Sequence, residues 1–140
     1  MSYEEKKAEI EKRRAERAAE RLARDTKELE GEVGDMLLSD EMVLVRFPEA
    51  DVSLPGHYVG RRPRAPEIAR FKSIMWRDNA QRGAIEAKAN AGADLARQCR
   101  VYPSAERYDA LVDAHAMVPD RVAQALIEAA QAGAEAEGKG

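Results

Sequence analysis

The sequence predicts a mainly α chain with a small antiparallel β-hairpin, an α+β class in which a long charged helix precedes the hairpin and a multi-helix domain. Three observations predict it. No Pro or Gly interrupts residues 2–30, where the strong helix formers Glu, Lys, Arg and Ala dominate. Val43, Val45 and Phe47 then alternate along one face of an extended run. From Pro66 onward, apolar residues recur at helical spacing.

Composition limits the classes of protein. With 140 residues, 44% hydrophobic and 5% aromatic, the chain fits one domain with a modest core. A net charge of −3 offers no overall basic field for nucleic acid. One cysteine cannot form an internal disulfide, and no His–Cys cluster has zinc-site spacing. No run of about 18 apolar residues occurs. We expect a soluble cytosolic protein without metal or cofactor.

Residues 1–34 are expected to form a charged helical extension. Ser2 and Glu5 have capping-box spacing, and Gly31 and Gly34 are suited to end the helix. Apolar residues recur every seven positions at Ala8, Ala15, Leu22 and Leu29. Such a thin stripe is typical of a weak coiled-coil seam. The helix is therefore either solvated and separate from the domain, or docked on a partner or a second copy.

The domain is expected over residues 35–132, beginning with a β-hairpin at about 42–60. Such an element is marginal alone, so it must pack on helices or pair its edge with a partner. His57 follows Pro55 and Gly56 and is expected to be a solvated turn residue.

Basic residues concentrate after the hairpin. Residues 60–82 carry seven basic and two acidic residues, net +5, and include Arg61, Arg62 and Arg64. They indicate either a plain basic surface or contact with an acidic partner surface. RNA or DNA ranks third, because aromatic side chains do not alternate with the arginines as stacking platforms would.

Four helices are expected after the hairpin, at about 66–78, 79–100, 105–115 and 119–132, followed by a flexible tail at 133–140. Phe71, Met75 and Trp76 are interpreted as core residues. The helices that follow Tyr102-Pro103-Ser104 and Val118-Pro119 form a helical hairpin.

No catalytic motif is recognisable. Cys99 lies near a helix C-terminus, where the helix dipole disfavours a thiolate, so we interpret it as a buried packing residue and not as the nucleophile of a dyad with His115. Asp109 and Asp113 are interpreted as a solvated acidic face. We expect no catalytic, metal or cofactor-binding residue, and no enzyme.

The order of elements resembles that of a phage protein family. "HYVGRRPRAPEI", "FKSIMW", "ARQCRVYPS" and "ERYDALVDAHAMVPDRVAQALIEAA" follow one another as in the tail assembly chaperones of long-tailed bacteriophages. The resemblance covers about residues 42–130 and leaves the long first helix unplaced.

The resemblance implies a non-enzymatic chaperone in the host cytoplasm, which binds the tape measure protein and tail tube protein during tail morphogenesis. An apolar helical surface or a strand edge would bind these partners. The candidate partner-binding residues are Val43, Val45, Arg61, Arg62, Arg64, Leu111 and Leu126. Self-association through the first helix is possible, and membrane contact is not expected. Two alternatives stay open: a structural virion component or head-tail adaptor, and a nucleic-acid-binding regulator that uses residues 60–82.

Overall fold

The computed structural model describes residues 2–35, 41–48, 50 and 53–139. Within these residues it contains five helices and three strands. In chain order they are α1 (Tyr3–Val33), β1 (Met42–Arg46), β2 (His57–Arg61), α2 (Ala65–Met75), α3 (Ala84–Cys99), β3 (Arg100–Tyr102), α4 (Ala105–Ala114) and α5 (Val118–Lys139). The expected mainly α, α+β class is confirmed.

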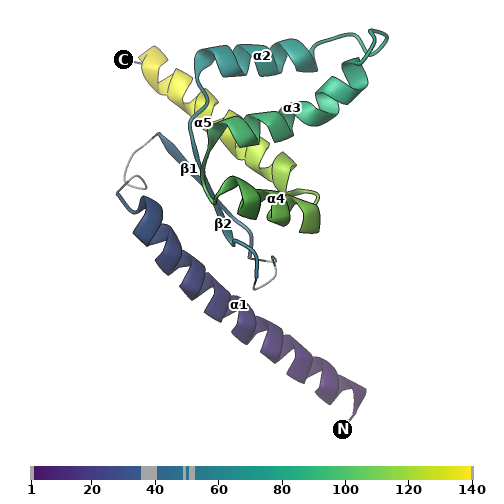
Figure 1. Cartoon of the computed structure of the whole chain (residues 1–140), viewed down its shortest axis with the longest axis vertical. Helices are drawn as coiled ribbons and strands as arrows, with labels where there is room; N and C mark the ends of the chain where they lie inside the picture. The colour runs from purple at the N-terminus through teal and green to yellow at the C-terminus, as the bar shows by residue number, and fades with distance from the viewer. Residues whose placement is uncertain (1, 36–40, 49, 51–52, 140) are drawn as a thin grey trace.

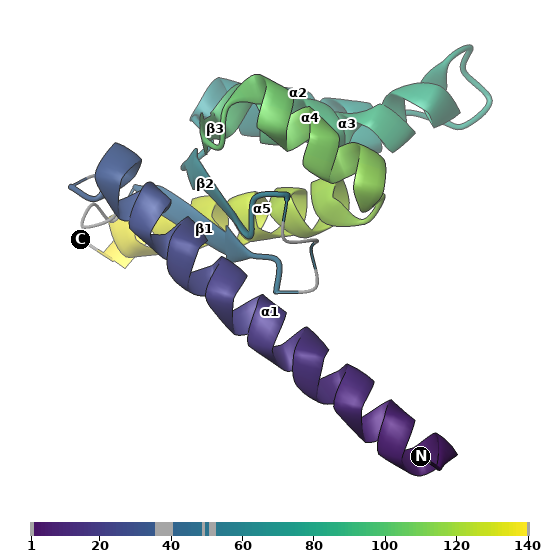
Figure 2. The same cartoon turned by 60° about the horizontal axis from the view of Figure 1, so that its bottom comes forward.

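The strands form one antiparallel sheet in the order β1-β2-β3. Val45 of β1 lies opposite Tyr58 of β2, and Val59 of β2 lies opposite Tyr102 of β3. The hairpin was expected, but β3 was not, because its three residues follow a helix without a break in the apolar pattern. Helices α3, α4 and α5 lie on one side of the sheet and α1 lies on the other (Figures 1 and 2). The sheet is therefore the middle of three layers.

The main core lies between the sheet and helices α3, α4 and α5. Its fully buried members include Phe47, Tyr58, Cys99, Tyr108, Leu111, Val122 and Leu126. The Tyr58 hydroxyl donates a hydrogen bond to the carbonyl of Ala96 at 2.7 Å, which fastens β2 to α3. Gly60 leaves room for that ring, because a Cβ there would lie 2.7 Å from the Tyr58 side chain. The expectation that Cys99 is a packing residue agrees with its complete burial.

The second half of α1 covers the other face of the sheet. Leu29 and Val33 pack there with Val59 and Tyr102. The Ser2–Glu5 capping box and the end at Gly34 are as expected. The expected seven-residue seam does not form, since only Leu29 of its four members is buried. The buried positions instead recur every four residues from Arg21 to Val33. At 3.6 residues per turn, residues four apart lie on nearly the same face of a straight helix.

The first half of α1 projects beyond the sheet (Figures 1 and 2). We call residues 3–20 the arm; all are exposed except the half-buried Ala18. The interpretation as a solvated helix applies to the arm alone. The second half docks on the chain's own sheet, which neither interpretation expected.

Two boundaries differ most from those expected. The helix expected from residue 79 begins at Ala84, after Gly83 with φ +76°, a backbone conformation that suits glycine and interrupts a helix. The last helix was expected to end at residue 132, but α5 continues to Lys139; Gly140 lies outside the described residues. This last stretch is rich in Ala and Glu, which favour helix.

Helix α2 is the least buried element of the domain. None of its residues is buried, and it packs chiefly beside α3. Phe71 contacts the main core from its edge, but Met75 is 41% exposed and Trp76 is 79% exposed. The interpretation of Met75 and Trp76 as core residues is therefore wrong, because α2 has helices on only part of its circumference.

Candidate functional site

A buried polar cluster joins α1 to the sheet. The carboxylate of Asp25 accepts hydrogen bonds from the backbone N–H of Gly56 at 3.1 Å and from the Tyr102 hydroxyl at 3.0 Å, and it pairs with Nδ1 of His57. Asp25 is 4% exposed and His57 1% exposed. The expectation of a solvated His57 is wrong, because β2 begins at this residue and α1 covers it.

The cluster keeps Asp25 charged. Burial by itself would raise the pKa of Asp25, but the hydrogen bonds from His57 and Tyr102 outweigh it and hold that pKa below its usual range. Burial, with the nearby Asp25 carboxylate, raises the pKa of the Tyr102 hydroxyl, which therefore stays protonated as a donor. Both oxygens of the Asp25 carboxylate thus bond to buried groups of the sheet and its hairpin.

The imidazole–carboxylate pair has the components of an oriented general base. Ser53 lines a hollow of about 270 Å³ together with Asp25, Arg21 and Arg107. Among the described residues, however, no hydrogen bond joins Ser53 to His57, and the ring is almost fully enclosed. Arg21 donates to the carbonyls of Phe47 and Pro48, at 3.2 and 2.6 Å. The geometry is that of a structural cluster that holds α1 against the sheet.

Cys99 and His115 have no arrangement suited to nucleophilic catalysis. Burial and, secondly, the charge of Glu67 raise the pKa of the Cys99 thiol to about 11, so it is protonated near neutral pH. His115 caps the C-terminus of α4 and is half-buried. The acidic face proposed at Asp109 and Asp113 is exposed, and Asp109 pairs with Arg97 at 3.7 Å.

The three candidate arginines largely contact their own chain. Arg61 forms a two-pronged ion pair with Glu67, at 2.6 and 2.8 Å. Arg62 is half-buried and lies against Gly133 of α5, where a Cβ would meet its guanidinium at 2.6 Å. Only Arg64, the N-cap of α2, is exposed. Two of the three candidate arginines are therefore used within the domain.

Most of the candidate apolar residues belong to the core. Leu111 and Leu126 are fully buried, Val45 is 9% exposed, and Val43 packs at the edge of the same core. In this fold Val45, Leu111 and Leu126 are not available to a partner. Helical spacing identified them correctly as apolar-face residues, but that spacing cannot separate a face that meets a partner from one that meets the sheet.

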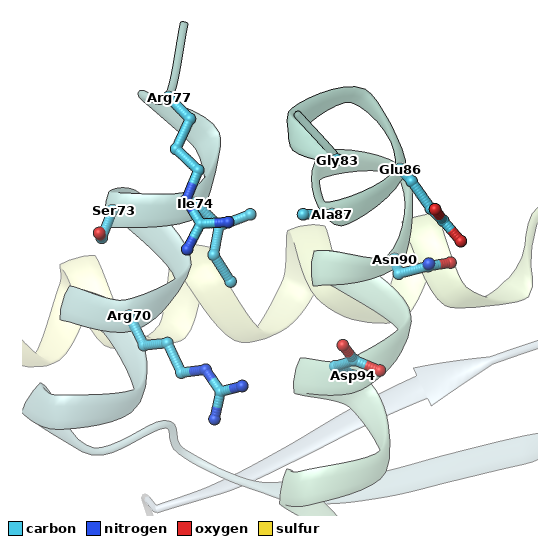
Figure 3. A pocket seen from close by; sticks show the side chains of 9 residues that line it. All are labelled: Arg70, Ser73, Ile74, Arg77, Gly83, Glu86, Ala87, Asn90 and Asp94. Atoms are coloured by element: carbon cyan, nitrogen blue, oxygen red, sulfur yellow. The ribbon is translucent and has the colours of Figure 1, made fainter. Parts of the chain in front are cut away.

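A polar hollow of about 410 Å³ lies on one side of the α2–α3 pair (Figure 3). Arg70 and Ser73 line it from α2, Arg77 from the segment just after α2, and Asn90 and Asp94 from α3. In Figure 3 the Arg70 side chain reaches from α2 toward α3. Its open, mixed-charge lining is typical of solvated surface between two helices.

An apolar groove of about 320 Å³ lies where α2, α3 and α5 meet. Phe71, Met75, Ala123 and Ile127 contribute its apolar lining. Gly92 of α3 also lines it, and a Cβ there would lie 3.2 Å from the Cβ of Ala123, so α3 and α5 approach closely. We call this site the α2–α3–α5 groove.

Charged and polar side chains border the groove. Asp120, Gln124 and Glu128 follow one another along the edge of α5, and Lys88 lies on the α3 side, where it donates to the Asn79 side chain at 2.6 Å. A groove with an apolar lining and a charged rim can accept the apolar stripe of an amphipathic helix. Sequence reasoning missed this site. The four-residue spacing of the acidic edge beside the apolar face of α5 was the signal that could have indicated it.

Comparison with known proteins does not place the chain in a family. No family model, curated protein or solved structure matches it. None of the helices in the described part of the chain is both long and apolar enough to cross a membrane. Nor do the described residues contain a group of three or more His, Cys, Asp or Glu that could hold a metal ion.

Proposed function

We propose that this protein is a non-enzymatic phage tail assembly chaperone, which acts in the host cytoplasm on the tape measure protein and tail tube protein. The observation that carries the proposal is the α2–α3–α5 groove, with Met75 in its lining and the exposed Trp76 next to it in sequence. The resemblance of residues 42–130 to tail assembly chaperones supports it.

The chemistry of the partner fits the groove. A tape measure protein is a long helical chain, and its apolar stripes aggregate when nothing covers them. A groove between helices binds such a stripe through spaced apolar anchors, while its polar rim stays in water. Binding of this kind needs no cofactor and no reaction step.

Co-expression with the tape measure protein of the same phage tests the proposal. The tape measure protein should remain soluble and co-purify with the chain, and Met75→Asp should abolish both effects. Ile85→Asp is the matched control, because Ile85 is 69% exposed on α3 and does not line the groove. Circular dichroism checks that both variants are folded.

Two results would contradict the proposal. One is a tape measure protein that is equally soluble with and without the chain. The other is the presence of this protein in purified mature particles at a fixed copy number, which a structural virion component would show and a chaperone would not.

A further inference from the structure

The arm carries a segregated pattern of charge that the domain does not use. With 3.6 residues per turn, Tyr3, Ile10 and Arg17 lie along the middle of one face. Lys6, Lys7, Arg13 and Arg14 flank them, so five of the six basic residues of the arm share this face. The six glutamates lie on the rest of the circumference. Tyr3 is 80% exposed and Ile10 50% exposed.

We propose that this basic face docks into the α2–α3–α5 groove of a second copy of the chain. The groove offers what the arm face needs: an apolar lining for Tyr3 and Ile10, and an acidic edge at Asp120 and Glu128 for the flanking bases. The inference does not rest on the identity of the tape measure partner.

The spacings agree along the two helices. Tyr3 and Ile10 are separated by a rise of about 10 Å, and Asp120 and Glu128 by about 12 Å, at 1.5 Å per residue. Two apolar side chains of the arm thus span a length of helix similar to that of the two carboxylates of the rim. Among the described residues that line the groove, Lys88 of α3 is the only basic one, and its ammonium donates a hydrogen bond to the Asn79 side chain.

The contact has to form between two molecules. Asp25, Leu29 and Val33 fix the second half of α1 on the sheet, and the arm extends from there away from α2, α3 and α5 (Figures 1 and 2). Each copy therefore has one arm to donate and one groove to accept. Such a head-to-tail contact forms open chains or closed rings. It also occupies the groove, so self-association and partner binding exclude each other.

Two double variants separate the surfaces. Ile10→Asp/Arg14→Glu disables the arm, and Ala8→Asp/Lys12→Glu is its matched control, with the same kinds of change on the opposite face of the same helix. Asp120→Lys/Glu128→Lys disables the groove rim. Glu106→Lys/Asp113→Lys, at exposed positions of α4, is the matched control for charge.

Sedimentation velocity over a concentration series tests the proposal. The wild type and both controls should associate, more weakly at high salt because the contact uses exposed charges. Each disabled variant should have a dissociation constant raised by about tenfold or more. A mixture of the two disabled variants should form a 1:1 dimer, since one keeps an intact groove and the other an intact arm.

Three results would overturn the proposal. A wild type that stays monomeric into the millimolar range would do so. Association that survives in Asp120→Lys/Glu128→Lys would also overturn it, because the arms would then pair with each other and not with the groove. The third is the absence of a dimer in the mixture, provided that circular dichroism shows both variants to be folded.

Discussion

The carboxylate of Asp25 on α1 bonds to the imidazole of His57 on β2, 32 positions later in the chain, and both side chains are almost fully buried. Together with Tyr102 of β3, this pair connects a helix that would otherwise be a separate extension to two strands of the sheet. The orientation of the arm depends on this connection, because Asp25 lies only five residues beyond Glu20, where the arm ends.

Asp25→Ala should destabilise the fold strongly. The substitution leaves three buried groups without their acceptor, the Gly56 N–H, the His57 ring and the Tyr102 hydroxyl. We expect the free energy of unfolding to fall by about 3 kcal/mol. Urea denaturation followed by circular dichroism measures it. Asp113→Ala, at an exposed site, should change stability by less than about 0.5 kcal/mol. Equal losses in the two variants would contradict a structural role for the cluster.

The Arg61–Glu67 ion pair should make stability depend on acid pH. The hydrogen bonds from Arg61 lower the pKa of Glu67 from 4.5 to about 2. Because the folded-state pKa is the lower one, the contribution of Glu67 is complete above pH 4.5 and is lost as the pH falls toward about 2. Unfolding free energies measured across this window should fall less steeply for Glu67→Gln than for the wild type. Parallel curves would show that the pair adds no pH dependence.

The Cys99 thiol should be unreactive in the folded protein. It is fully buried, and burial is the main cause that raises its pKa to about 11. A thiol-specific reagent at neutral pH should modify it only after unfolding in guanidinium. Cys99→Ala should lower the unfolding free energy by about 1–2 kcal/mol, as other large-to-small core changes do, and leave partner binding intact. Rapid labelling of the native protein would contradict this packing role.

Substitution of Leu126 should affect mainly the stability of the fold, whereas substitution of Met75 should affect mainly partner binding. Leu126→Ala creates a cavity in the main core, so we expect a loss of about 3 kcal/mol in unfolding free energy. Met75→Ala, at a position 41% exposed, should cost less than about 1 kcal/mol but weaken partner binding. Thermal unfolding and the co-purification assay separate these two effects. A binding defect in a folded Leu126→Ala protein would contradict the division between core and surface.

Local pattern predicted much of the fold. The capping box at Ser2 and the alternation at Val43 and Val45 depend on neighbouring residues, and the structure contains the helix and the strand that they predict. Strand β3 and the burial of His57 depend on contacts between residues far apart in sequence. His57 is buried only because α1 lies over the sheet, and nothing near His57 in the sequence reports that contact.

The candidate site was harder to predict for the same reason. An apolar stripe shows that one face of a helix is buried, but it does not show which element or partner covers that face. Leu111 and Leu126 face the domain's own core, whereas Met75, interpreted as core, lies at a groove. Arg61, a candidate from the basic segment, likewise contacts its own chain, because it pairs with Glu67 six residues later.

Trp76 offers the most direct test of the groove as the partner-binding site. It is the only tryptophan of the chain, and it is 79% exposed at the end of α2. Overlapping helical fragments of the tape measure protein can be titrated into Ile10→Asp/Arg14→Glu, which removes self-association through the arm. The account predicts a saturable blue shift of Trp76 emission with at least one fragment, and loss of that shift in a protein that also carries Met75→Asp. Fragment binding that leaves Trp76 emission unchanged, or a shift that persists with Met75→Asp, would contradict it.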